Sequence, residues 1–355
     1  MGKKINTEYL FLLFTLVVTI TGVVVLFSAF LDHDDKIYDS ASEIMGVKIQ
    51  QTVYGDSAQK ASRAAEKQIN LLFSQVSWRN DDSQVKKIND ESENEWISTS
   101  PGILSILIKS LNVAQDSEGA FDPTILPLSV VWHFYLEKKS TPSIEEINEG
   151  LKYVNYKYLK VNKEVLKARL FNEKSRLDLD SVTDGAACSV AIKQYQENGA
   201  PAGIIRVGNS VGVYGNKKDN GPFRVNILHP FKRSEGVNFG FLEVKNTCVS
   251  TVGFGENSFY QDGKFFHEII NPLTGFPVDN DLVSVTVVHY DGVIASALAR
   301  ACFVLGKDKG ILLLDKYEAG GVFIDGQKNV FTTENTKETL DIVNIGGPDG
   351  FNVKH

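Results

Sequence analysis

The segment that decides the fold reads Phe266-His267-Glu268-Ile269-Ile270-Asn271-Pro272-Leu273-Thr274-Gly275-Phe276-Pro277. A β-rich run follows at residues 282–287, and an alanine-rich run follows at residues 295–301. Pro and Gly punctuate regular structure, so the segment predicts a turn ahead of a strand and a helix. Titratable side chains placed at such a turn are typical of a functional site.

The half of the chain around this segment alternates between short strands and a few helices. Runs rich in β-branched and aromatic residues, bounded by Gly, Asn and Asp, predict strands at residues 204–207, 211–214, 223–228, 241–244, 283–289 and 321–324. Helices are predicted at residues 186–196 and 292–305. This order favours an α+β fold with a mixed or antiparallel sheet and flanking helices, rather than a doubly wound fold.

The first half of the chain is richer in helix. Apolar residues recur at helical spacing over residues 58–76, and Pro101 opens a second apolar helix that we expect to run through Val113. Ser143 followed by Glu146 forms a capping box that predicts a helix start. A strand is expected from about residue 42 to Tyr54.

Composition limits the classes of protein that the chain can belong to. The chain is 43% hydrophobic and 23% charged, a composition typical of globular proteins. Its 355 residues suffice for one large domain or two modest ones. The net charge of -7 gives no electrostatic reason to expect nucleic-acid binding. Cys188, Cys248 and Cys302 lie in apolar patterns without metal-binding spacing, which indicates buried free thiols.

The N-terminus predicts a membrane anchor. Residues 9–31 contain no charged side chain, and as a helix this run would extend roughly 34 Å, enough to cross a bilayer. Lys3 and Lys4 precede it and Asp32, Asp34 and Asp35 follow it, which favours a cytoplasmic N-terminus. A cleaved signal peptide is the alternative. The expected order is a cytoplasmic end (1–8), an anchor (9–31), a linker (32–42), an extracytoplasmic domain (43–345) and a tail (346–355).

Several ordered motifs resemble the FAD:protein FMN transferase family, the ApbE-type flavin transferases. The motifs are residues 118–124, 177–187, 266–277, 284–287 and 295–301. Together with the predicted anchor, the resemblance implies a single-pass protein of a bacterial cytoplasmic membrane, and it implies that the periplasmic domain uses FAD and Mg²⁺. Such proteins attach FMN to a Thr of an acceptor flavoprotein and release AMP. By the same resemblance, FAD is bound at Met45, Trp78, Ala120, Phe121, Asp122, Asp178, Asp184, Ile269 and Ile270, and the backbone carbonyl of Ser181 helps to hold Mg²⁺.

Two of these positions have competing interpretations. Trp78 can stack on a flavin ring, but it can equally be a core residue. Asp184 stands where the family usually has Lys, and a carboxylate there repels a pyrophosphate unless a cation intervenes. A structural reading of Asp184 is also available, because Asp in the first turn of a helix is favoured by the helix dipole.

The reactive positions of the family are the ones that differ here. The family's His falls on Glu268, with His267 adjacent, and its Asp before Pro falls on Asn271. The metal-binding Asp and Thr fall on Ser296 and Arg300, and a further frequent Asp falls on Ala299. Ser and Arg do not provide a Mg²⁺ site, because Mg²⁺ prefers oxygen ligands and a guanidinium repels it.

Two hypotheses follow from these substitutions. In the first, Arg300 brings positive charge where the metal would be and binds phosphate oxygens itself, giving an FAD-binding protein with weak or no transfer activity. In the second, the chain is an active flavin transferase that uses displaced groups, with His267 and Glu268 as catalytic candidates. A purely structural alternative places Arg300 on an exposed helix face.

Overall fold

The computed structural model describes residues 36–92, 95–134, 140–217, 221–232, 236–254, 257–337, 340–342 and 350–354. The predicted membrane anchor, residues 9–31, lies outside these ranges. Among the helices within them, none has both the length and the apolar character needed to cross a bilayer.

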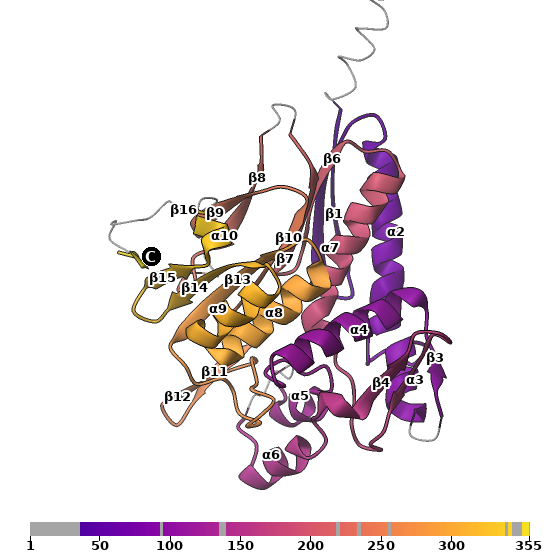
Figure 1. The fold of residues 1–355 in the computed structure, drawn as a ribbon, viewed down its shortest axis with the longest axis vertical. Helices are drawn as coiled ribbons and strands as arrows, with labels where there is room; N and C mark the ends of the chain where they lie inside the picture. Colours follow the sequence, from indigo (N-terminus) through magenta and orange to yellow (C-terminus); the bar gives the residue numbers. More distant parts are fainter. Residues whose placement is uncertain are drawn as a thin grey trace, which may run out of the picture.

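A large mixed sheet forms the centre of the fold (Figure 1), as the sequence predicts. Its strand order is β1-β2-β6-β7-β10-β13-β14-β15-β17. All neighbours pair antiparallel except β15 and β17, which pair parallel. The strands are β1 (Ile37–Ile44), β2 (Val47–Tyr54), β6 (Ala202–Val207), β7 (Ser210–Gly215), β10 (Thr247–Gly253), β13 (Leu282–His289), β14 (Gly320–Asp325), β15 (Asn329–Thr332) and β17 (Asn352–Lys354).

Helices cover one face of this sheet. They are α2 (Ala58–Val76), α4 (Pro101–Asp116), α7 (Asp180–Glu197), α8 (Gly292–Leu305) and α9 (Lys307–Lys316). Figure 1 shows α7 and α8 lying across the sheet, with α2, α4 and α9 beside them. The apolar stripe of α2, from Ala61 through Ile69 to Val76, is buried in this layer, which is why its helical spacing was so clear in the sequence.

A small sheet covers the other face. It has the order β16-β9-β8, from β8 (Phe223–Leu228), β9 (Asn238–Val244) and β16 (Leu340–Ile342). Phe223, Val225 and Phe239 pack against strands of the large sheet in a second core. Because helices and this small sheet enclose it, β13 is buried along almost its whole length, which explains its continuous apolar run.

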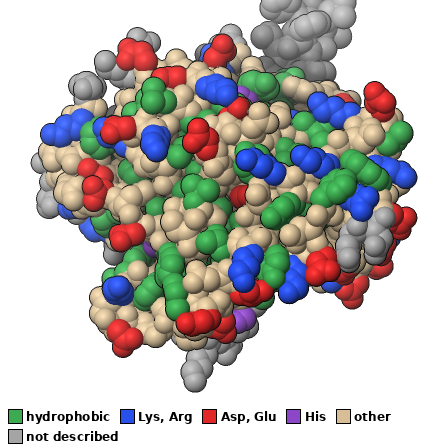
Figure 2. Space-filling model, turned by 60° about the horizontal axis from the view of Figure 1, so that its bottom comes forward, with side chains coloured by type: hydrophobic (Ala, Val, Ile, Leu, Met, Phe, Trp, Pro, Cys, Tyr) green, Lys and Arg blue, Asp and Glu red, His purple; other side chains and the backbone are tan. Residues whose placement is uncertain are grey.

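The remaining elements lie near the start of α7, except for α10, which packs against β14 and β15. They are α3 (Gln84–Glu91), β3 (Ile97–Ser98), α5 (Leu126–Trp132), α6 (Ile144–Leu151), η1 (Tyr156–Tyr158), β4 (Leu159–Asn162), β5 (Lys167–Leu170), β11 (Ser258–Gln261), β12 (Lys264–His267) and α10 (Glu334–Lys337). Leu128, Trp132 and Ile270 belong to a separate small core there. Side chains of both charge signs are interspersed with apolar ones on the face that Figure 2 shows.

Most predicted elements are confirmed, and the differences occur at strands. The capping box of Ser143 and Glu146 opens α6, and the three cysteines are buried and free. The strand expected from residue 42 is instead a hairpin that turns at Met45 and begins at Ile37, inside the predicted linker. β17 lies inside the predicted tail, where Phe351 is buried against Phe239. β1 and β17 are the two edge strands of the large sheet. Neither has a strong apolar pattern, so the sequence did not predict them as strands.

A close crossing of α7 and α8 fixes the geometry of the region around the start of α7. A Cβ atom added to Gly185 would lie 2.0 Å from the carbonyl oxygen of Gly292 and 2.4 Å from the hydroxyl of Ser296. Only glycine allows the two backbones to approach this closely. The second turn of α7 is thereby held against the N-terminal end of α8.

Candidate functional site

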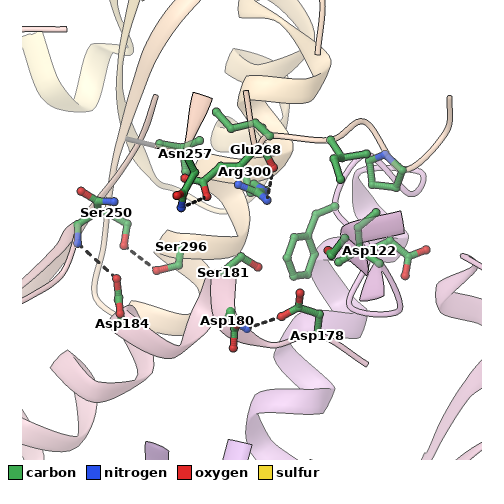
Figure 3. Close-up of a pocket in the computed structure, with 18 of the residues that line it drawn as sticks. Asp122, Asp178, Asp180, Ser181, Asp184, Ser250, Asn257, Glu268, Ser296 and Arg300 are labelled. Carbon is green, nitrogen blue, oxygen red and sulfur yellow. Dashed lines mark hydrogen bonds between the residues drawn. The ribbon is translucent and has the colours of Figure 1, made fainter. Parts of the chain in front are cut away.

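A cavity of about 340 Å³ lies where α7 begins, between α8, the end of β10, the 120–125 loop and the 268–272 segment. Figure 3 shows its polar lining, which comes from segments far apart in the sequence. Most predicted site residues line it, namely Ala120, Phe121, Asp122, Asp178, Ser181, Asp184, Glu268, Ile269, Ile270, Ser296 and Arg300. The volume falls in the range of about 300–1,000 Å³ that is typical of small-molecule sites.

The start of α7 contributes a row of acidic residues. The Asp178 carboxylate accepts a hydrogen bond from the Asp180 backbone N–H at 2.9 Å, so it satisfies the first backbone donor of the helix. Burial, together with the neighbouring Asp180 carboxylate, raises the pKa of Asp178 to about 7, although Arg79 and Arg300 oppose the shift. At neutral pH the Asp178 carboxyl group is therefore protonated part of the time.

Asp184 lies one turn further along α7 and faces the 208–210 turn. Its carboxylate accepts a hydrogen bond from the backbone N–H of Asn209 at 3.3 Å. Gly208 has φ +49, and a Cβ there would lie 2.2 Å from the Asp184 carboxylate, so this contact requires glycine. Burial raises the pKa of Asp184 to about 6. The family's usual Lys position thus holds an acid that is bonded to the protein's own backbone.

Three serine hydroxyl groups form a buried cluster in the cavity wall. The Ser250 Oγ atom lies 2.6 Å from that of Ser210 and 2.7 Å from that of Ser296. The Ser210 and Ser296 Oγ atoms are 3.4 Å apart. Strands β7 and β10 supply two of these serines and α8 supplies the third. The hydroxyl groups satisfy one another, and the cluster carries no charge.

Arg300, one turn beyond Ser296 on α8, places its guanidinium group in the cavity wall. Its Nη2 atom donates to the backbone carbonyl of Glu268 at 3.4 Å, and the Glu268 carboxylate accepts a bond from Asn257 Nδ2 at 2.7 Å (Figure 3). Burial lowers the pKa of Arg300, while the Glu268 and Asp178 carboxylates raise it. The side chain is partly buried, so it does not lie on an exposed helix face as the structural alternative required.

Asp122 lines the cavity, but its carboxylate accepts hydrogen bonds from Thr124 and Tyr156. One carboxylate oxygen accepts bonds from the backbone N–H and the hydroxyl of Thr124, at 2.8 and 2.6 Å, and the other accepts from the Tyr156 N–H at 2.7 Å. Burial nevertheless raises its pKa to about 6. The Asp178 N–H donates to the Pro123 carbonyl at 2.9 Å, which brings the two acidic motifs together.

Three predicted site residues lie outside the cavity lining. Met45 is 57% exposed, in the β1–β2 turn. His267 is buried, with Nε2 3.0 Å from the Val278 carbonyl and Nδ1 accepting from the Ile269 N–H. Burial lowers the pKa of His267 to about 4, so the ring is neutral. Trp78 is partly buried in the main core, beneath Arg79.

The structure adds residues that the sequence did not single out. Arg79, Asp180, Ser210, Ser250 and Asn257 all line the cavity. Arg79 and Asp180 are 101 positions apart, yet they form an ion pair of 2.8 Å. Ser210 begins β7 and Ser250 lies in β10, and nothing in the sequence of these strands showed that their hydroxyl groups would meet.

The donor atoms at the family's metal position do not fit Mg²⁺. Ser296 offers a neutral hydroxyl that is already bonded to Ser250, and Arg300 offers only N–H donors. Mg²⁺ requires hard oxygen ligands, usually including carboxylates. Across the part of the chain that the structure describes, no three His, Cys, Asp or Glu side chains are grouped so that they could hold a metal ion.

The fold and the cavity define an α+β protein with a small-molecule site that carries two arginines. Its sequence matches the profile of the ApbE family over residues 45–323. The chain therefore belongs to the ApbE family, which confirms the resemblance found in the sequence.

Relatives and solved structures agree with this assignment. The FAD:protein FMN transferase of Vibrio cholerae is 26% identical over 72% of this chain and 77% of its own length. The Escherichia coli K12 protein of the same name is 26% identical over 78% and 81%. The crystal structure of the ApbE protein from Thermotoga maritima has a TM-score of 0.78 and 27% identity, covering 86% of this chain and 99% of its own.

Proposed function

We propose that this chain is a membrane-anchored, FAD-binding member of the ApbE family with weak or no Mg²⁺-dependent transfer of FMN to protein Thr. The observation that carries the proposal is the position of Arg300. Its guanidinium group lies in the cavity wall next to the neutral Ser296, where the family has a metal-binding pair. The two relatives above are named FAD:protein FMN transferases, and by analogy with them we take FAD as the ligand.

Arg300 is suited to hold a phosphate oxygen. A guanidinium group binds phosphate through two parallel N–H donors, and such charge-assisted bonds are stronger than neutral ones. Partial burial removes competing water and strengthens the attraction to an anion. When FAD is bound, its pyrophosphate would supply the anion, and the isoalloxazine would supply redox chemistry that the side chains lack.

The acidic side chains of the lining are compatible with an anionic ligand, because hydrogen bonds, partial protonation and two arginines reduce their repulsion of it. Asp122 and Asp184 already accept hydrogen bonds from the protein, and Asp178 has a pKa of about 7. The apolar Phe121, Ile270 and Pro272 line the same cavity and can contact a ring system. Arg79 and Arg300 offset part of the remaining negative charge.

The membrane anchor is supported by the sequence. Residues 9–31 are free of charge and are flanked by Lys on one side and Asp on the other. With this orientation the domain would lie outside the cytoplasm, in the periplasm of a bacterium with two membranes. Acceptor flavoproteins, if the chain serves any, would meet it there.

The proposal is tested with the full-length chain purified in detergent. FAD is titrated with and without Mg²⁺ by flavin fluorescence, and FMN transfer to a Thr-containing acceptor peptide is followed through AMP release. We expect FAD to bind with the same affinity in both conditions and AMP release to be absent or slow. Mg²⁺-dependent AMP release at a rate typical of enzymes would contradict the proposal.

A pair of variants tests Arg300 itself. Arg300→Ala should weaken FAD binding roughly 10- to 100-fold, because a hydrogen bond to a charged group contributes about 1.5–3 kcal/mol. Arg224→Ala is the control, since Arg224 lies on β8 and outside the cavity lining. Equal FAD affinity of Arg300→Ala and the unaltered chain would show that the arginine does not replace the metal.

The alternative is an active flavin transferase for an extracytoplasmic flavoprotein. One observation favours it: Glu268 occupies the position of the family's His, lines the cavity and is held by Asn257. A carboxylate so placed can act as a general base toward an attacking hydroxyl. His267, with its ring hydrogen-bonded to the backbone away from the cavity lining, has no such position in the structure.

A further inference from the structure

We propose that Asn257 is a positioning residue of the cavity, because its side-chain amide holds the Glu268 carboxylate away from Arg300 and keeps the guanidinium group available for an anionic ligand. The inference rests on the proposed function, since it takes the pyrophosphate of FAD as that anion. It explains how a carboxylate and an arginine line one cavity without forming an ion pair with each other.

The β11–β12 hairpin brings Asn257 and Glu268 together. Ser258 and His267 are paired at the open end of the hairpin, so the residues just outside them, Asn257 and Glu268, lie opposite each other. The Asn257 Nδ2 atom donates to a Glu268 carboxylate oxygen at 2.7 Å (Figure 3). Both residues line the cavity and Asn257 is exposed, so the bond lies where the cavity meets solvent.

Aromatic packing holds the hairpin in place. Phe259 and Phe266 are paired across it, with ring centroids 5.3 Å apart. The Phe266 ring also lies 5.7 Å from the Trp132 ring, and both phenylalanines pack against the small core that contains Trp132. The position of Asn257 relative to Glu268 is therefore fixed by the fold and not only by their own hydrogen bond.

Arg300 is close to the Glu268 carboxylate but is not paired with it. Within the described part of the chain, Arg79 and Arg224 form ion pairs with carboxylates, whereas Arg300 does not. Its Nη2 atom donates to the Glu268 backbone carbonyl at 3.4 Å. Burial lowers the pKa of Arg300 and the Glu268 carboxylate opposes that shift, so the two charges already act on each other.

Without the Asn257 amide, the Glu268 carboxylate would turn toward Arg300. The backbone of Glu268 is already within hydrogen-bond distance of the guanidinium group, so a change of rotamer brings its carboxylate into range. Carboxylates and phosphates bind the same guanidinium N–H donors, often two at a time. An incoming pyrophosphate would then have to displace an internal anion first. Asn257 removes this competition by giving the carboxylate another donor.

The test is a double-mutant cycle on the full-length chain in detergent. Asn257→Ala removes the amide, Glu268→Ala removes the carboxylate, and the double variant removes both. Asn329→Ala is the matched control, because the Asn329 amide also donates to a carboxylate, that of Asp325 at 2.8 Å, but lies on β15 and outside the cavity lining. Dissociation constants are measured for FAD, inorganic pyrophosphate and riboflavin, together with the melting temperature of each variant.

We expect Asn257→Ala to weaken the binding of FAD and pyrophosphate roughly three- to tenfold, the factor that corresponds to losing one hydrogen bond. Riboflavin has no phosphate, so its affinity should stay the same. In the Glu268→Ala background the same substitution should have no effect, because no carboxylate is left to restrain. Asn329→Ala should bind all three compounds as the unaltered chain does.

Two results would overturn the inference. One is equal weakening by Asn257→Ala in the two backgrounds, since the amide would then act other than through Glu268. The other is an Asn257→Ala variant that binds FAD and pyrophosphate as tightly as the unaltered chain.

The unaltered chain tests the proposed function separately. If it binds pyrophosphate but not FAD, the proposed function fails, while the cycle measured with pyrophosphate still decides the role of Asn257. An unaltered chain that binds neither compound contradicts both the proposed function and the inference.

Discussion

The hydroxyl oxygens of Ser250 and Ser296 lie 2.7 Å apart, and Ser296 is on the same face of α8 as Arg300, one turn away. By the resemblance to the flavin transferases, Ser296 falls on the position of a metal-binding carboxylate, and here it makes an uncharged hydrogen bond. Under the proposed function, a hydroxyl group with a partner stands in place of the carboxylate, and the guanidinium group of Arg300 takes the place of the metal's positive charge.

The double variant Ser296→Asp/Arg300→Thr should regain a response to Mg²⁺. It restores an oxygen-donor pair, and Ser250 remains available to orient the new carboxylate. We expect millimolar Mg²⁺ to raise the melting temperature of the double variant, as preferential binding to a folded protein does. Arg300→Thr alone is the control and should show no such rise. A folded double variant that ignores Mg²⁺ would show that other positions also prevent metal binding.

FAD binding should strengthen as the pH falls from 8 to 6. The pKa of Asp178 is about 7, so its carboxylate is mostly charged at pH 8 and mostly neutral at pH 6. A neutral Asp178 repels the pyrophosphate less. We expect the dissociation constant to fall roughly three- to tenfold over this range, measured by fluorescence titration. In Asp178→Asn the dependence between pH 8 and 7 should vanish, leaving the part near pH 6 where Asp122 and Asp184 titrate, and an unchanged slope above pH 7 would exclude Asp178 as its source.

The stability of the protein should also respond to Asp178. Its folded-state pKa is raised from the ordinary 3.8, so the protonated carboxyl stabilises the fold at low pH, and this contribution is lost as the pH rises toward 7. Asp178→Asn stays neutral and keeps an oxygen for the Asp180 N–H. We expect it to be more stable than the unaltered chain by roughly 1–2 kcal/mol at pH 8 and equally stable near pH 4. Urea unfolding at both pH values measures this, and a destabilised variant at pH 8 would refute it.

Gly185→Ala should disrupt both the fold and the cavity. The new Cβ would lie 2.0 Å from the Gly292 carbonyl oxygen, so α7 and α8 must separate. We expect a loss of about 2–4 kcal/mol in the free energy of unfolding, together with weaker FAD binding. Gly102→Ala is the matched control, because nothing lies within 4 Å of its added Cβ, and it should be neutral or slightly stabilising. Similar melting temperatures for the two variants would argue against the tight crossing.

Glu268→Gln distinguishes the two functions. Gln keeps an oxygen for the Asn257 amide but removes the negative charge beside Arg300, so FAD should bind several-fold more tightly. If Glu268 were the general base of an active transferase, the same change would abolish FMN transfer. Measuring affinity and transfer in one preparation separates these outcomes. An unchanged affinity accompanied by loss of transfer would favour the active enzyme.

The sequence predicted the fold well because a buried helix face or strand requires apolar residues in a recognisable local pattern. The apolar stripe of α2, the capping box of Ser143 and the continuous apolar run of β13 are each local patterns of neighbouring residues in the chain. The edge strands β1 and β17 were not predicted, because strands at the edge of a sheet do not need that apolar pattern. Similarly, the motifs located most of the cavity lining, since each motif forms one local segment of the wall.

The sequence by itself thus determined the family, the α+β architecture and the substitutions at Glu268, Ser296 and Arg300. Only the tertiary structure decided what those residues contact. The meeting of Ser210, Ser250 and Ser296, and the pairing of Arg79 with Asp180, depend on the strand order and on the helix crossing at Gly185. Such contacts join residues tens of positions apart, and no local periodicity specifies which side chains will face one another across the fold.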